Sequence, residues 1–444
     1  MGIHRHLISI LLCAGFWVVE ARADEPPGLH AALVELERRG QFSGAVVVRG
    51  PKGVRFARGY GLADPSTGRR FTPDTPVDGA SLAKPLVASA VLLLRRDRKI
   101  DLDRPVRTYL PDFPHERTTV RHLLAHSAGL PDYDAFEPVA GKSNLALLRE
   151  LRVRRTPPAF VPGSGFAYCN ICYDTLALLV ERVSGTDLAT FLHSAILRPV
   201  GAHSVVVRPM RLSQWTGRGI GYRRNAHGQA ETNDSIEGEA FFGGGNLSFN
   251  AADLARWGSA WWTPRLATIR GLATKPARVG SAFSGLTWGN WNCAGGGRRC
   301  SYSGHHQGFH HNVYWDRDRR ISVAMVTNNT LAPSLQQRLQ RALVAFSEGR
   351  SEEARRELAS LPEDSPVSPG SYVLPGGEIV RLAGTGPRMT VRRKGLDYGA
   401  YLIGPGIRYV PGLDVYLSGS TGGRLHWLSL YEDAMATRTS QASR

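Results

Sequence analysis

Two segments with the pattern of β-hairpins lie far apart in the sequence, and together they constrain the fold of this chain most. Residues 44–61 carry β-branched residues on both sides of the turn PKG, and residues 312–328 do so around a charged, Arg-rich turn. Helical spacing of leucines in residues 29–36 and similar patterns elsewhere place helices around and between the hairpins. The other helical patterns occupy residues 173–183, the segment after Asn250 and residues 335–346. This arrangement predicts an α+β layered domain.

A change of pattern near residue 350 predicts a second unit. Residues 351–368 are charged and interrupted by prolines, which is typical of a linker. From residue 369 onward, short strand-like runs are separated by Gly and Pro, so residues 369–444 are expected to form a small all-β module with a tail. The larger domain is then expected to span residues 24–350.

The first 23 residues have the pattern of a signal peptide. Arg5 supplies a basic start, residues 7–19 are apolar, and Ala21 and Ala23 are small residues at the expected cleavage positions. The apolar run is too short to span a bilayer as a helix, and no later run approaches that length. The sequence predicts an exported protein, periplasmic or secreted, that is cleaved near Ala23 and keeps no transmembrane segment.

The formal net charge of +17 restricts the partners that the chain can bind. Arginine greatly outnumbers lysine, and the basic doublets are scattered rather than gathered into a long run. This pattern does not predict a nucleic-acid partner, because such proteins concentrate their basic residues on one face. It does favour electrostatic association with an anionic cell envelope.

The cysteines fit an oxidising compartment. Cys13 belongs to the predicted signal peptide, which leaves an even number in the mature chain. Cys293 and Cys300 flank a Gly-rich turn, so a disulfide across that turn is predicted. Cys169 and Cys172 form a CxxC pair, but no thioredoxin-like βαβ pattern surrounds them, and a redox role is the weaker interpretation.

The segment GASLAKP places Ser81 and Lys84 three residues apart at the start of a helical pattern. Residues at this spacing lie on one face of a helix, so the lysine could reach the serine hydroxyl. A serine becomes a good nucleophile only when a base takes its proton, and a lysine can be that base if burial lowers its pKa. Alone, the pair is a weak signal, and a capped amphipathic helix is the preferred interpretation of it.

Two later motifs favour catalysis. The segment YCN contributes Tyr168 and Asn170 just before a helix, and HQG contributes His306 and Gly308 before a strand. The order SxxK, YxN, HxG resembles the penicillin-recognising serine hydrolases, which include class C β-lactamases, D,D-peptidases, D-amino-acid-specific peptidases and esterases. The connecting segments TVRHLLAHSAGLPDY and GGGNLSFNAADLARW resemble that family too, and the resemblance covers residues 29–346.

The resemblance implies the fold and the chemistry. The fold would be a mainly antiparallel sheet flanked by helices, plus an α-helical subdomain, with the small β module added. Ser81 would attack the substrate carbonyl and form an acyl-enzyme without a cofactor. Lys84 and Tyr168 would share the general base and acid work, and either could take the proton. Asn170 would bind the amide side chain of the substrate.

The third motif departs from the β-lactamase pattern. The resemblance implies an oxyanion hole made by the backbone N–H groups of Ser81 and Phe309, with Gly308 allowing close approach of the strand. His306 stands where β-lactamases carry a lysine. Because His305 is adjacent, either histidine could occupy this position of the motif. A neutral histidine binds a carboxylate less well than lysine does, which favours peptidase or esterase activity over β-lactam hydrolysis.

Three alternatives follow from the same residues. Four histidines near Cys293 and Cys300 could hold zinc, but alternation along a strand would divide them between two faces, and no metal is predicted. The histidines are His305, His306, His310 and His311.

The fold could also belong to a β-lactamase or to a non-catalytic peptidoglycan-binding protein. The preferred hypothesis is an exported serine hydrolase that acts on an ester or amide bond, as a D-amino-acid or peptidoglycan-type peptidase or as a carboxylesterase.

Overall fold

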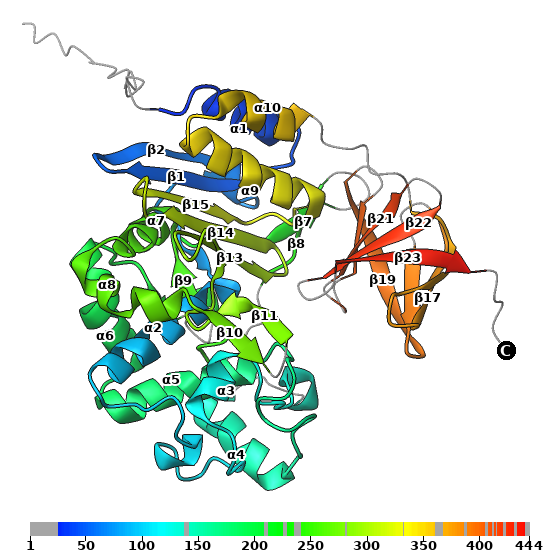
Figure 1. The fold of residues 1–444 in the computed structure, drawn as a ribbon. Coiled ribbons are helices and arrows are strands. Elements are labelled where there is room, and N and C mark those ends of the chain that lie inside the picture. Colours follow the sequence, from blue (N-terminus) through cyan, green and yellow to red (C-terminus); the bar gives the residue numbers. More distant parts are fainter. Residues whose placement is uncertain are drawn as a thin grey trace, which may run out of the picture.

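The computed structural model consists of a larger α+β unit and a C-terminal β-barrel (Figure 1). It describes residues 25–136, 142–207, 212–224, 229–234, 241–279, 282–331, 333–359, 367–385, 389–404, 407–410, 413, 415–420, 423–429 and 433–439. The predicted signal peptide lies outside these ranges, and its cleavage stays a prediction.

The main sheet is antiparallel and joins the two ends of the larger unit. Its strand order is β12-β13-β14-β15-β1-β2. The bounds are β1 Gly44–Gly50, β2 Gly53–Tyr60, β12 Asn292–Ala294, β13 Arg299–His306, β14 Phe309–Asp316 and β15 Ile321–Thr327. Strand β1 pairs with β15, with Val46 opposite Met325. Both predicted hairpins, β1–β2 and β14–β15, are confirmed.

Hydrophobic layers cover both faces of this sheet, because successive side chains of a strand point to opposite faces. Val46 and Val48 pack in a core with α1, α9 and α10, whereas Ala45 and Val47 belong to a second core with α2 and α7. Figure 1 shows α1, α9 and α10 together on one side of the sheet. The helices are α1 Leu29–Arg38, α2 Ala83–Arg96, α3 Val120–Leu124, α4 Asn144–Arg154, α5 Asn170–Ser184, α6 Leu188–Leu192, α7 Ala251–Ala260, α8 Pro264–Ala273, α9 Pro333–Ser347 and α10 Ser351–Ala359.

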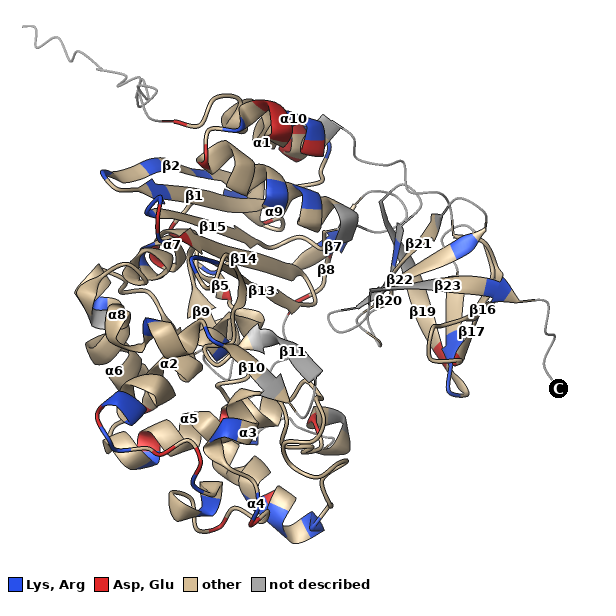
Figure 2. Ribbon diagram, in the orientation of Figure 1, with Lys and Arg blue, Asp and Glu red and all other residues tan. Residues whose placement is uncertain are grey.

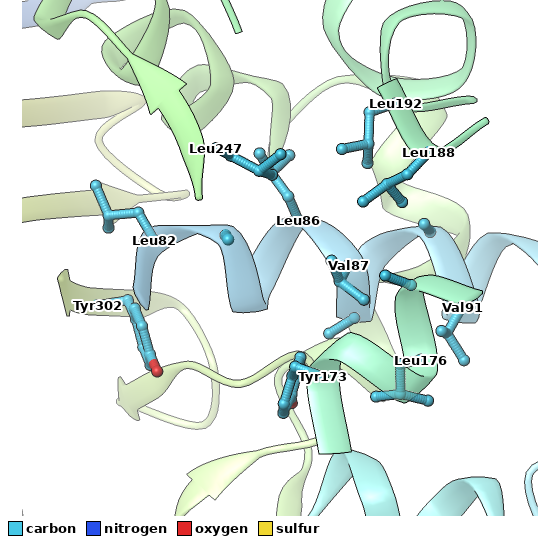
Figure 3. Packing of buried hydrophobic residues seen from close by; sticks show 14 of the residues in the cluster. Leu82, Leu86, Val87, Val91, Tyr173, Leu176, Leu188, Leu192, Leu247 and Tyr302 are labelled. Atoms are coloured by element: carbon cyan, nitrogen blue, oxygen red, sulfur yellow. The ribbon is translucent and has the colours of Figure 1, made fainter. Parts of the chain in front are cut away.

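Helix α2 runs through the interior of the second core. Residues 83–94 are all buried, and apart from Lys84 and Ser89 they are apolar, as expected for a helix inside a core. In Figure 3 its side chains meet those of α5 and α6, among them Leu176 and Leu188. This packing fixes the start of α2, which carries Lys84 and directly follows the short turn that contains Ser81.

Short sheets connect these layers. They pair β3 Leu62–Asp64 with β4 Arg69–Arg70, β5 Val77–Asp78 and β6 Val206–Val207 with β9 Leu247–Phe249, β7 Tyr222–Arg224 with β8 Ala230–Thr232, and β10 Pro276–Val279 with β11 Ala282–Thr287.

The C-terminal module is a closed antiparallel barrel with a hydrophobic core of its own. Strand β16 closes the barrel by pairing with β23, Tyr372 opposite Arg438. Val380, Val391 and Trp427 are among the fully buried residues inside. The bounds are β16 Gly370–Val373, β17 Ile379–Ala383, β18 Met389–Arg393, β19 Leu396–Gly404, β20 Ile407–Val410, β21 Val415–Ser420, β22 Arg424–Ser429 and β23 Asp433–Thr439. The predicted all-β module is confirmed.

The predicted linker, residues 351–368, is wrong in its first half. Residues 351–359 form α10, which packs against α9, and Ala354 is fully buried there. An ion pair between Arg341 and Glu357 joins the two helices. The charged residues that resembled a linker instead cover the solvent side of an amphipathic helix with a narrow apolar face. The larger unit therefore extends to Ala359.

The basic residues are dispersed in space as they are in the sequence. Figure 2 shows Lys and Arg on helices and strands of both units rather than on one face. Within the described residues, no helix combines the length and the apolarity needed to cross a bilayer.

Because the barrel core shares no residue with the two cores of the larger unit, we expect a protein truncated after Ala359 to fold alone. Calorimetry of the full chain should show a barrel transition that is absent from the truncated protein. Insoluble truncated protein, or one that lacks a cooperative unfolding transition, would show that the barrel is integral to the larger unit.

Candidate active site

Ser81 lies in a strained turn that leads into α2. The turn, Ala80–Leu82, is a short 3₁₀ helix, and Ala80 has a φ of 47°, in the left-handed region that non-glycine residues rarely adopt. The Asp78 carboxylate accepts a hydrogen bond from the Ala80 N–H at 2.9 Å. Such strain persists only where the surroundings enforce it, and here it presents the Ser81 side chain at the end of a buried helix.

Ser81, Lys84 and Tyr168 are in direct contact, as the sequence predicts. The Lys84 ammonium donates to Ser81 Oγ at 3.0 Å, and the Tyr168 hydroxyl donates to the same oxygen at 2.9 Å. Lys84 Nζ also lies 4.7 Å from the centre of the Tyr168 ring. The serine hydroxyl therefore has two groups within reach that could take or return its proton.

Lys84 has the electrostatics of a base. It is fully buried, and this burial lowers the pKa of its amine to about 7, against the opposing effect of the Asp132 and Asp174 carboxylates. Besides Ser81, Lys84 Nζ donates to Asn170 Oδ1 at 2.7 Å and to the Gly244 carbonyl. In the neutral amine those two acceptors can use both N–H groups, which leaves the lone pair directed at Ser81 Oγ.

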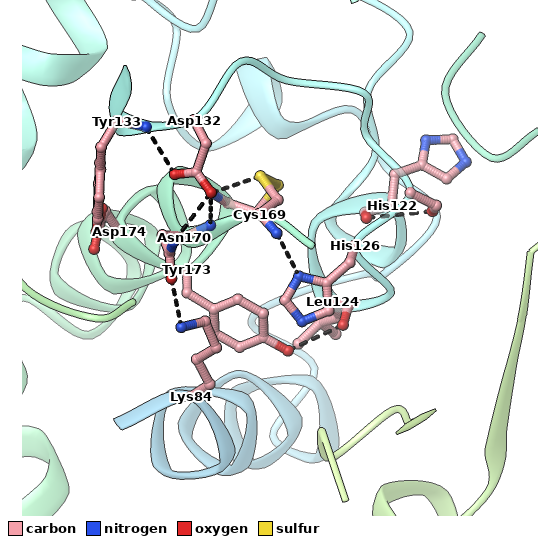
Figure 4. The surroundings of a disulfide bond; sticks show 12 residues. Lys84, His122, Leu124, His126, Asp132, Tyr133, Cys169, Asn170, Tyr173 and Asp174 are labelled. Atoms are coloured by element: carbon pink, nitrogen blue, oxygen red, sulfur yellow. Dashed lines mark hydrogen bonds between the residues drawn. A yellow bond between two sulfur atoms is a disulfide. The ribbon is translucent and has the colours of Figure 1, made fainter. Parts of the chain in front are cut away.

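Asn170 is held from both sides. The Asp132 carboxylate accepts from the Asn170 side-chain amide at 3.0 Å and from its backbone N–H at 3.2 Å (Figure 4). The side-chain oxygen of Asn170 therefore faces Lys84. The sequence predicted Asn170 at the site, but it did not single out Asp132, which lies in the segment LPDY.

Asp174 holds Gly244, whose carbonyl is one of the three acceptors of Lys84. Its carboxylate accepts from the Gly244 N–H at 2.8 Å and from the Tyr133 hydroxyl at 2.7 Å. The Gly244 carbonyl in turn accepts from Lys84. Burial raises the pKa of Asp174 to about 7, so Asp174 and Lys84 titrate as a pair in the same range. Sequence reasoning missed Asp174, although it lies four residues after Asn170 and therefore on the same face of α5.

The strand segment that touches the Ser81 turn is YSG, not the predicted HQG. The Tyr302 hydroxyl lies 3.3 Å from the Tyr168 hydroxyl. A Cβ on Gly304 would lie 2.7 Å from the Gly79 carbonyl oxygen and 3.0 Å from the Leu82 nitrogen, so only glycine fits against this turn. The segment of β13 beside Ser81 therefore carries a tyrosine, a serine and a glycine.

The predicted positions of the third motif need correction. His306 is the last residue of β13, and it pairs with Phe309 at the hairpin end. The Gly308 N–H donates to the Asn233 carbonyl, and the Phe309 ring packs against Gly221. The HQG pattern is part of a tight turn beyond the contact with Ser81, and Tyr302 to Gly304 lie four residues earlier. Only the position of the strand was predicted correctly.

His126 is a neutral side chain that holds the segment of Tyr168 and Cys169 in place. Its ring stacks on that of Tyr168, with centres 4.6 Å apart and planes 11° apart, and its Nδ1 accepts from the Cys169 N–H at 3.0 Å. Burial lowers the pKa of His126 to about 3, so the imidazole is neutral at physiological pH. The sequence did not show this contact.

The residues that the structure describes contain two disulfides. Cys293 and Cys300 face each other across β12 and β13 and are bonded, as predicted. Cys169 and Cys172 are also bonded, at the start of α5.

The predicted histidine cluster is divided by the hairpin. His305 and His310 face each other, with their Nδ1 atoms 2.8 Å apart, whereas His311 lies 2.7 Å from the Asp78 carbonyl. In the part of the chain that the structure describes, no group of three or more His, Cys, Asp or Glu side chains is arranged to hold a metal ion.

A comparison with protein families agrees with this geometry. The family model described as Beta-lactamase matches residues 29–346. The chain belongs to the beta-lactamase family. This chain is a serine hydrolase of that family, and an esterase and a D-aminopeptidase are among its relatives.

Relatives within the beta-lactamase family differ in their activities. Penicillin-binding protein 4* of Bacillus subtilis is 26% identical over 68% of this chain and 71% of its own length. Esterase EstB of Burkholderia gladioli is 33% identical over 39% of this chain and 49% of its own length. The D-aminopeptidase of Brucella anthropi is 31% identical over 37% of this chain and 33% of its own length.

A solved structure matches both units. The octameric penicillin-binding protein homologue from Pyrococcus abyssi superposes with a TM-score of 0.60 and 19% identity, covering 92% of this chain and 98% of the other. At this identity the match establishes the fold alone.

The coupled titration of Lys84 and Asp174 predicts the pH dependence of activity. Protonated Lys84 has no lone pair, so kcat/KM should fall about tenfold per pH unit below about pH 7 and level off above it. Ester hydrolysis measured across this range gives the midpoint of the acid limb.

The variant Asp174→Asn identifies the groups responsible for that limb. The Asp174 charge raises the pKa of Lys84, so its removal should move the midpoint to lower pH. A midpoint that stays in place or rises in Asp174→Asn would contradict the assignment.

Proposed function

We propose that Ser81 is the nucleophile of an acyl-transfer reaction and that Lys84 and Tyr168 move its protons. The observation that carries this proposal is the position of Ser81 Oγ, 3.0 Å from Lys84 Nζ and 2.9 Å from the Tyr168 hydroxyl. A hydroxyl between an amine of near-neutral pKa and a phenol has both a base and a proton donor in place.

In the first step, neutral Lys84 takes the Ser81 proton as Ser81 Oγ bonds to the substrate carbonyl carbon. The developing negative charge is met by the Ser81 N–H and by the edge of β13 next to Gly304. The bond to the leaving alcohol or amine then breaks, and the Tyr168 hydroxyl passes it a proton that Lys84 replaces. A water molecule, deprotonated by the same pair, then releases the acid from Ser81.

The substrates proposed are carboxylic esters and amides of D-amino acids. The esterase and the D-aminopeptidase among the relatives support this class. The neutral Tyr302 also supports it, because burial raises the pKa of its hydroxyl to about 12 and this position offers no cation to a substrate carboxylate. A carboxylate such as that of a β-lactam therefore finds no positive partner on this part of β13.

The proposed compartment is outside the cytoplasm. Two disulfides support export, since such bonds persist in oxidising compartments. The signal sequence itself lies outside the described residues. Mass spectrometry of the N-terminus of the secreted or periplasmic protein would test cleavage near Ala23.

The Ser81→Ala variant tests the nucleophile. A fluorophosphonate probe should label wild-type protein at Ser81, and Ser81→Ala should lose both the label and essentially all ester turnover, by several orders of magnitude. Ser89→Ala is the matched control, because Ser89 lies on α2, the helix that follows the turn of Ser81, and donates to the Pro85 carbonyl, away from the site. Turnover in Ser81→Ala within tenfold of wild type would exclude Ser81 as the nucleophile.

A substrate panel tests the proposed class. p-Nitrophenyl esters and D-amino-acid p-nitroanilides should be turned over, whereas nitrocefin should acylate Ser81 slowly and be released slowly. Rapid nitrocefin hydrolysis that disappears in Ser81→Ala would make the protein a β-lactamase instead. A folded wild-type protein that no probe acylates would favour the non-catalytic peptidoglycan-binding alternative.

A further inference from the structure

The disulfide Cys169–Cys172 lies inside the catalytic segment itself. Its first cysteine stands between Tyr168 and Asn170, which contact Ser81 and Lys84 respectively. Cys169 is also the N-cap residue of α5. The disulfide therefore joins Cys169, the extended residue between Tyr168 and Asn170, to the first turn of the buried helix α5.

Cys169 is fixed at two points. Its N–H donates to His126 Nδ1 at 3.0 Å, and its sulfur is bonded to Cys172, whose own N–H approaches that sulfur at 3.1 Å. Figure 4 shows this disulfide beside Asn170, with His126 on its other side. Because His126 also stacks on Tyr168, it holds both Cys169 and Tyr168, whereas Asn170 is held by Asp132.

Global stability does not explain a bond at this position. A cross-link stabilises a protein mainly by restricting the unfolded chain, and the effect grows with the length of the closed loop. The separation is three residues for Cys169–Cys172 and seven for Cys293–Cys300. The bond inside the catalytic segment should thus stabilise the whole fold no more than the other one does.

We propose that Cys169 and Cys172 are positioning residues, and that their disulfide makes catalysis depend on oxidation by fixing Tyr168 and Asn170 against Ser81 and Lys84. This inference rests on the proposed function of that site. Without the bond, Cys169 loses its disulfide link to α5 and keeps the hydrogen bond from its N–H to His126. A small displacement there moves a proton donor and a lysine acceptor together.

The redox step is a two-electron exchange with a dithiol. The dithiol supplies two electrons and two protons and closes to its own disulfide, while the bond between Cys169 and Cys172 becomes two thiols. Both cysteines are buried, at 1% and 0% exposure, so reduction requires local opening of the start of α5. The enzyme would then be poorly active in a reducing cytoplasm and fully active in an oxidising compartment.

Paired serine variants test the proposal. Cys169→Ser/Cys172→Ser should lower kcat for p-nitrophenyl ester hydrolysis at least tenfold while KM changes less than threefold, because positioning of the reacting groups is lost and the binding surface is not. Cys293→Ser/Cys300→Ser is the matched control and should keep kcat within twofold of wild type. Melting temperatures should fall no further in the first variant than in the control.

Reduction provides an independent measurement. Incubation with dithiothreitol, followed through alkylation and mass spectrometry, should lower wild-type kcat in step with opening of Cys169–Cys172, and reoxidation should restore it. The Cys293→Ser/Cys300→Ser protein should respond in the same way, and the Cys169→Ser/Cys172→Ser protein should not respond further.

The possible failures can be told apart. Oxidised wild-type protein must first be labelled at Ser81 by the fluorophosphonate, and absence of that label would contradict the proposed function itself. If labelling succeeds, a Cys169→Ser/Cys172→Ser variant with kcat within twofold of wild type overturns the positioning proposal. A loss of kcat equal to that of the control variant overturns it as well.

Discussion

The structure depends on keeping one primary amine in the interior of a helical core. A buried ammonium is costly, and the cost is reduced here in two ways: the pKa falls toward neutrality, and every N–H of Lys84 has an acceptor. Those acceptors come from the Ser81 turn, from the start of α5 and from the loop before β9. Helix packing, the strained turn and the aspartate-supported loops therefore share one function, which is to hold three oxygens around a single nitrogen.

The sequence predicted the parts of the site that are close in the chain or carry a distinctive motif. Ser81 and Lys84 follow from helical spacing, and Tyr168 and Asn170 from a short segment before a helix. Asp132 and Asp174 escaped notice because a buried carboxylate that supports an amide or a backbone N–H has no local pattern. The third motif was predicted four residues too far along the chain, because a His-rich turn matched HxG. The residues beside Ser81 are instead identified by the close approach of Gly304 to Gly79, which has no sequence pattern.

Elements of the fold with a local sequence pattern could be predicted in the same way. Strand alternation and turn residues identified both hairpins of the main sheet and the β character of the barrel. The pattern did not show that β16 and β23 close that barrel, because pairing between the first and last strands leaves no local signal. Helix α10 was mistaken for a linker, since its apolar face is narrow and its charges dominate the composition.

The pairing of β1 with β15 determines when the chain can fold. Residues 44–50 pair across the middle of the sheet with residues 321–327, so the β1–β2 hairpin and the β12–β15 meander cannot join until both have been synthesised. A distant pairing of this kind slows folding, because the entropy of closing a long loop is lost before the contacts form. During vectorial synthesis the emerging chain therefore stays without its central sheet until nearly the whole larger unit has left the ribosome. A chain in that condition is still unfolded, and the proposed export through a membrane channel requires an unfolded polypeptide.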